Sequence, residues 1–151
     1  MTRFGQARAL ALAVPLALVA GAYAFQFSGY PPCEMCWWQR YPHFAAIALA
    51  LLAFAVPKRA LVALAATAIL ISGAIGVFHA GVEYRWWEGL TRCAATAPAA
   101  SGADFLKEIM ATPTIRCDTA PWDLFGISLA GWNAIVSIPF ALLILWRLSR
   151  A

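Results

Sequence analysis

Charged residues are scarce in this chain of 151 residues: 12% are Asp, Glu, Lys or Arg, whereas 63% are hydrophobic. Soluble globular domains carry roughly 25% charged residues, so the composition excludes that class. The net charge of +4 does not indicate a nucleic-acid partner, because the basic residues are scattered and no polar domain presents a basic face. We therefore interpret residues 1–151 as a single integral membrane domain.

Four apolar segments are long enough to be membrane helices, and they cover about 9–27, 41–56, 60–82 and 124–146. A helix needs roughly 20 apolar residues to cross the hydrocarbon core. Ala22-Tyr23-Ala24 resembles a signal-peptide cleavage site, but the first segment is longer than a usual signal core. Only residues 57–59 separate the second and third segments, which predicts an antiparallel helical hairpin. We expect an all-α, four-helix bundle with outer loops at 28–40 and 83–123.

The placement of charge predicts the orientation of this bundle. Basic residues without acidic neighbours occupy both chain ends and the hairpin turn: Arg3, Arg8, Lys58, Arg59, Arg147 and Arg150. All seven acidic residues fall in the two opposite loops. The positive-inside rule then puts both termini in the cytoplasm, so the four cysteines face outward, where disulfides persist.

The cysteines form two pairs of unlike spacing. Cys33 and Cys36 form a Cys-x-x-Cys motif after the first segment, whereas Cys93 and Cys117 are separated by residues 94–116. A four-cysteine zinc site would need a second close pair, so we predict disulfide chemistry and no metal site. Two structural disulfides are the alternative to a redox relay, but a Cys-x-x-Cys ring is too small to stabilise much.

Two ionisable residues accompany the cysteines. Arg40 lies one helical turn after Cys36, where a guanidinium favours a thiolate; alternatively it is a headgroup anchor. Pro42 either starts the second helix or kinks it. His79, near the outer end of the third segment, is either a functional group at membrane depth or a hydrogen-bonded structural histidine. Gly73 and Gly76 give the same segment small residues for close helix packing.

The second outer loop contains a short predicted helix. Asp104 can cap residues 105–111, and Thr112-Pro113 stops the helix. Its apolar residues share one face, which can lie on the membrane surface or pack against another chain.

Taken together, these features resemble the disulfide bond formation protein B (DsbB) family. They are the four helices, the outward Cys-x-x-Cys, Arg40, His79 and the loop cysteine pair. Residues 122–128 and Gly131-Trp132-Asn133 also look like that family's entry to its last helix. The match covers nearly the whole chain.

The resemblance implies a thiol oxidoreductase of the bacterial inner membrane. It would reoxidise a periplasmic DsbA-like dithiol oxidase and reduce a membrane quinone, either ubiquinone or menaquinone. By position, Cys93 would form the mixed disulfide with the partner, and Cys117 would then attack Cys33. Cys36 would pass the electrons to the quinone, Arg40 would stabilise its charge, and His79 would line or hydrogen-bond the quinone head.

Two other functions are alternatives to this one. A vitamin K epoxide reductase-like protein would carry its close cysteine pair after the loop cysteines, whereas here the close pair comes first. A heavy-metal uptake protein would favour thiols along a transport path or on the cytoplasmic side. The chain lacks a haem motif and a Gly-rich dinucleotide loop, and it is too small for a flavin domain. A lipid-soluble acceptor therefore suits its thiol chemistry.

Overall fold

The computed structural model describes residues 2–90 and 115–151. In these ranges the chain forms four helices and two short strands: α1 (Arg3–Phe27), α2 (Glu34–Ala55), α3 (Arg59–Glu83), β1 (Asp123–Leu124), β2 (Ile127–Ser128) and α5 (Leu129–Ser149). The predicted all-α character is confirmed. Cys93 and the predicted helix over 105–111 lie outside the described residues.

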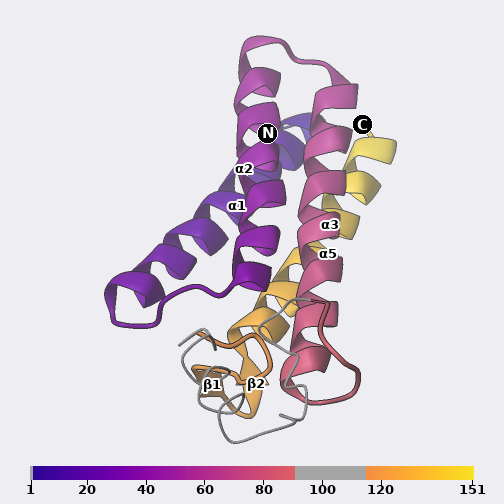
Figure 1. The fold of residues 1–151 in the computed structure, drawn as a ribbon. Coiled ribbons are helices and arrows are strands. Elements are labelled where there is room, and N and C mark those ends of the chain that lie inside the picture. Colours follow the sequence, from indigo (N-terminus) through magenta and orange to yellow (C-terminus); the bar gives the residue numbers. More distant parts are fainter. Residues whose placement is uncertain (1, 91–114) are drawn as a thin grey trace, which may run out of the picture.

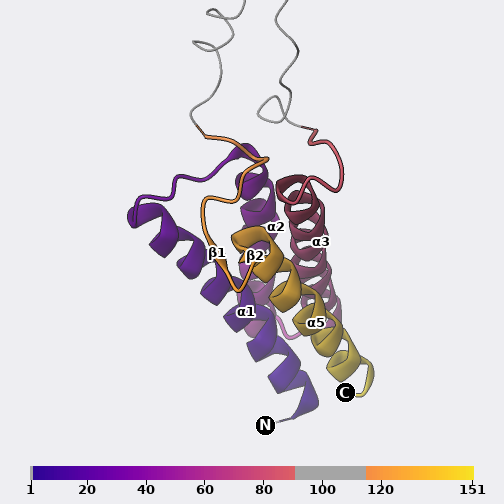
Figure 2. The same ribbon diagram turned by 90° about the horizontal axis from the view of Figure 1, so that it is seen from below.

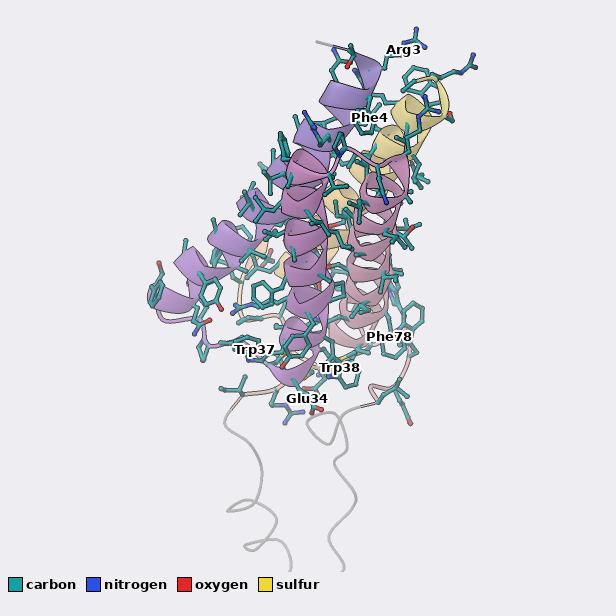
Figure 3. The ribbon with its side chains drawn as sticks, turned by 90° about the horizontal axis from the view of Figure 1, so that it is seen from above. Arg3, Phe4, Glu34, Trp37, Trp38 and Phe78 are labelled. Atoms are coloured by element: carbon teal, nitrogen blue, oxygen red, sulfur yellow. The ribbon has the colours of Figure 1, made fainter. Side chains whose placement is uncertain are left out.

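The chain ends and the α2–α3 turn lie at one end of the helices, and the hairpin of β1 and β2 lies at the other (Figure 1). Residues of both termini and of that turn line one surface hollow of about 470 Å³. Figure 3 shows Arg3 and Phe4 at this end, with Glu34, Trp37 and Phe78 at the opposite end. The segments rich in arginine are therefore neighbours in space.

Three helices, α1, α3 and α5, are long and apolar enough to cross a membrane. α2 is not among them, although it spans 22 residues and continues through Pro42. It buries three polar side chains, those of Gln39, Arg40 and His43. The membrane passage of α2 thus stays a prediction.

Three helix starts differ from prediction, and each difference has a local cause. α1 begins at Arg3 and not at about 9, because Thr2 caps it: the Thr2 Oγ1 accepts a hydrogen bond from the backbone N–H of Gly5 at 3.1 Å. α2 begins at Glu34 and not at 41, because Cys33 caps it: the Cys33 Sγ accepts a hydrogen bond from the backbone N–H of Cys36 at 3.2 Å. The fourth helix begins at Leu129 and not at 124. Phe125 and Gly126 have positive φ angles of 55° and 74°, so the chain turns there, as a hairpin requires.

Small residues bring α3 and α5 into close contact. A Cβ atom at Gly76 would lie 2.9 Å from the carbonyl oxygen of Ala130, and one at Gly73 would lie 2.7 Å from the Ile138 side chain. The predicted small-residue packing of the third helix is confirmed. α1, by contrast, leans away from α2 toward its C-terminal end, as Figure 2 also shows.

We expect Gly76→Ala to lower the thermal stability of the protein in detergent. The added methyl group meets backbone atoms of α5, which cannot rotate away, and overpacking of this kind costs about 1–3 kcal/mol. That exceeds the gain of about 1 kcal/mol from replacing glycine in a helix. Thermal unfolding followed by circular dichroism measures the change. Gly21→Ala is the matched control, because nothing lies within 4 Å of its Cβ position; equal melting temperatures for the two variants would contradict the packing argument.

Candidate redox site

The Cys-x-x-Cys motif sits at the first turn of α2. The Sγ atoms of Cys33 and Cys36 are 2.9 Å apart, and both cysteines are free thiols. Cys33 donates a hydrogen bond to Cys36, and this bond, together with burial, raises the pKa of Cys33. The proton of the pair is therefore held on Cys33, and Cys36 is the favoured thiolate.

Cys117 is far from this pair in the sequence but lies close to it in the structure. It is fully buried and packs in one cluster with Cys33, Met35 and Val82. The neighbouring residues Arg116 and Asp118 form an ion pair with 2.5 Å between Nη2 and Oδ2, and the hydrogen bond from Arg116 lowers the pKa of Asp118. Cys117 and Cys33, which are far apart in the sequence, are thus brought together.

His79 lies next to these two cysteines. The ligand atoms of Cys33, His79 and Cys117 all lie within 4.8 Å of one another. The Nε2 atom of His79 is 3.6 Å from the Cys33 Sγ and 3.7 Å from a carboxylate oxygen of Glu83. The spacing alone would suit a metal ion, so the protonation of His79 decides between metal binding and thiol chemistry.

The hydrogen-bond network assigns that protonation. The side-chain amide of Gln39 donates to the carbonyl of Met35 at 3.2 Å and to Nδ1 of His79 at 2.8 Å. Its Oε1 accepts from Asn133 at 2.8 Å, so the amide cannot be reversed without losing these bonds. Nδ1 of His79 is therefore an acceptor and Nε2 carries the hydrogen. A protonated Nε2 cannot ligate a metal, whereas it can donate to a thiolate.

Arg40 is buried in the helix interface and is only 6% exposed. Its Nη1 donates to the Gln26 side chain at 2.7 Å, and its Nη2 donates to the carbonyl of Ala22 at 3.1 Å. The guanidinium also lies 4.8 Å from the ring centre of Tyr23 and 5.0 Å from that of Trp37. Both acceptors belong to α1, so Arg40 ties α1 to α2. A headgroup anchor would instead extend its charge toward water.

A cavity of about 230 Å³ lies between α1, α2 and α5, in the half of the molecule that contains the thiols. Most of its lining is apolar, and seven of its described residues carry polar side-chain groups: Tyr30, Cys36, Gln39, Arg40, His43, Trp132 and Asn133. The predicted pair of Cys36 and Arg40 is thus brought together on one cavity wall. His79, which was predicted at the cofactor, is not among the lining residues, and its role there stays a prediction.

Cys36 also faces a second hollow, of about 340 Å³, which lies on the loop side. Cys33, Glu83 and Arg116 line this hollow with it. Helices α1, α2 and α5 form most of the first hollow, whereas the second is formed mainly by loop residues within 29–31 and 115–121. Tyr30, Pro31 and Pro121 line both hollows. Cys36 therefore stands at the boundary between them.

Sequence reasoning missed most of the buried polar network next to the thiols. His43 is 3% exposed, and it contacts Ser72 on α3 and Asn133 on α5. The signal that could have indicated it is the spacing of Gln39 and His43, which lie one turn apart on one face of a helix. Their partners are too distant in the sequence to be found by periodicity.

Comparisons with known proteins agree with this geometry. The family described as "Disulfide bond formation protein DsbB" matches residues 5–147. None of the curated proteins and none of the solved structures matched the chain. The family match includes the thiol pair, the cavity and nearly all of the four helices. The chain is therefore a multi-pass membrane protein that belongs to the DsbB family of disulfide bond formation proteins.

Proposed function

We propose that the chain is a thiol:quinone oxidoreductase that reoxidises a DsbA-like dithiol oxidase on the periplasmic side of a bacterial inner membrane. The position of Cys36 carries this proposal. Cys36 lines both the hollow on the loop side and the apolar cavity between the helices. A thiol in that place can receive electrons from one side and deliver them to the other.

Electrons enter through the loop cysteines. A thiolate of the partner attacks Cys93 of the Cys93–Cys117 disulfide, which forms a mixed disulfide and releases Cys117 as a thiolate. Cys117 then attacks Cys33 of the Cys33–Cys36 disulfide, so a Cys33–Cys117 bond forms and Cys36 leaves as a thiolate. The shared burial of Cys33 and Cys117 in one cluster supports this exchange.

The cycle closes with two further exchanges. The partner's second cysteine attacks the mixed disulfide, which gives the oxidised partner and releases Cys93 as a thiolate. Cys93 attacks Cys117, restores the loop disulfide and releases Cys33. The two electrons taken from the partner then reside in the Cys33 and Cys36 thiols. We infer that the N–H at Nε2 of His79 stabilises the thiolates of this exchange, an inference supported by its 3.6 Å contact with Cys33.

The cavity fits the head group of a quinone, which when bound supplies an acceptor for two electrons and two protons. Apolar walls with a few polar groups are typical of sites for such molecules. Among the described residues that line the cavity, Arg40 supplies a permanent positive charge and Cys36 supplies a thiol. Arg40 would hold the thiolate of Cys36 and orient a carbonyl oxygen through its planar donors.

Turnover with a protein partner tests the proposal. The purified full chain, a reduced thioredoxin-fold partner and a short-chain quinone are mixed, and the quinone absorbance is followed together with the partner's free thiols. We expect loss of one quinone for each partner disulfide formed, and no loss with Cys36→Ser. If the partner stays reduced and the quinone absorbance does not change, the proposed function is wrong.

A further inference from the structure

One nitrogen of His43 is fully engaged in the buried network. Its Nε2 lies 2.9 Å from the Ser72 hydroxyl and 3.0 Å from the side-chain oxygen of Asn133. The Ser72 hydroxyl donates its own hydrogen to the carbonyl of Gln39 at 2.8 Å. Both atoms that face Nε2 are therefore acceptors, and the network assigns the ring hydrogen to Nε2.

The other nitrogen, Nδ1, is buried and has no hydrogen-bond partner among the described residues. With the hydrogen on Nε2, Nδ1 presents a lone pair that can only accept a hydrogen bond. The ring is neutral, because Arg40 is a cation of the same cavity and none of the described lining residues carries a carboxylate to offset a second positive charge. His43 is among the residues that line the cavity, and buried acceptors normally have a partner, so a ligand that carries a donor would satisfy this lone pair.

We propose that His43 accepts a hydrogen bond from a hydroxyl of the reduced hydroquinone, so that the cavity binds hydroquinone more tightly than quinone. The proposal rests on the function proposed above. The ring oxygens of a quinone are carbonyl acceptors, whereas those of a hydroquinone carry hydrogens. Only the reduced form can satisfy an acceptor, while the donors of Arg40 can serve either form.

Two substitutions separate the roles of the two ring nitrogens. In His43→Gln the side-chain amide nitrogen takes the place of Nε2 and keeps a donor toward Ser72 and Asn133, but the Nδ1 acceptor is lost. In His43→Asn the side-chain oxygen takes the place of Nδ1, and the donor toward the network is lost. A role in the network alone would make asparagine the more harmful change, whereas a role in recognition makes glutamine the more harmful one.

The test is a binding measurement on the full-length protein. All variants carry Cys36→Ser, which prevents electron transfer, and the short-chain quinone and its hydroquinone are titrated separately without oxygen. Quenching of tryptophan fluorescence reports binding, because Trp132 lines the cavity. We expect tighter binding of the hydroquinone by roughly two- to tenfold, the usual effect of one hydrogen bond, with this preference kept in His43→Asn and lost in His43→Gln.

Three results would overturn the inference. Equal affinities for the two forms in the Cys36→Ser parent contradict it, although binding itself would still support the quinone site. A preference that survives in His43→Gln assigns the discrimination to another group. Binding of neither form removes the quinone site itself, and with it both proposals.

Discussion

Replacing Cys33 with serine is expected to stop both halves of the thiol relay. In the proposed relay, Cys33 is the sulfur that Cys117 attacks and also the partner that forms a disulfide with Cys36, whose Sγ lies 2.9 Å away. A serine hydroxyl can form neither bond. We expect no oxidation of the protein partner and no quinone reduction, with either the partner or dithiothreitol as the reductant.

Loss of a loop cysteine should have a different effect. In Cys93→Ser or Cys117→Ser, oxidation of the partner is expected to stop, because the entry disulfide is missing. The Cys33 and Cys36 pair should still reduce quinone when dithiothreitol supplies the electrons. Partner thiols and quinone absorbance, measured side by side for each variant, separate the two steps. If a loop variant oxidises the partner at the parental rate, the loop disulfide is structural and the assigned order is wrong.

Arg40→Lys is expected to slow quinone reduction by about a hundredfold or more, the typical effect of losing one donor to a developing oxyanion. Lysine keeps the positive charge but replaces a planar fork with a point charge. It cannot reproduce the two bonds to Gln26 and Ala22, so the charge is no longer held at the cavity wall. We also expect slower alkylation of Cys36 at neutral pH, because less of it is thiolate.

A second variant separates the effect of the position of the Arg40 guanidinium from the effect of its charge. Gln26→Leu removes one of the two hydrogen-bond acceptors of Arg40. It leaves the guanidinium, its bond to Ala22 and its ring contacts in place. We expect a smaller effect on the quinone rate than that of Arg40→Lys. Steady-state rates over a range of quinone concentrations, with Cys36 alkylation in the same samples, measure both. Parental kinetics and alkylation in Arg40→Lys would return Arg40 to an anchoring role.

The proximity of the close thiol pair to Arg40 could be predicted from the sequence because its signals are local. Cys33, Cys36 and Arg40 lie within two helical turns, so their proximity follows from spacing alone. The start of α2 was missed because an apolar run shows only the part of a helix suited to hydrocarbon, whereas the cap at Cys33 extends α2 beyond that run. Leu124 and Phe125 were assigned to the last helix for a related reason. A hydropathy pattern does not distinguish the apolar residues of a hairpin from those of a helix that follows directly.

The wall of the cavity could not be predicted in the same way. The bond between His43 and Asn133 joins residues 90 positions apart, and the one between Gln39 and His79 joins residues 40 positions apart. Contacts of this kind depend on how α2, α3 and α5 pack. The position of His79 beside Cys33, and outside the cavity lining, has the same origin.

The buried network also bears on how the chain assembles in a bilayer. α2 and α3 are synthesised before α5, and together they can pair Ser72 with His43 and with the carbonyl of Gln39. The bond from Asn133 to the side-chain oxygen of Gln39 has to wait for the last helix. In the hydrocarbon core of the bilayer, no water is available to donate a hydrogen bond to an unpaired amide oxygen. Arrival of α5 thus completes a hairpin that is polar inside, and it fixes the register of three helices in one step.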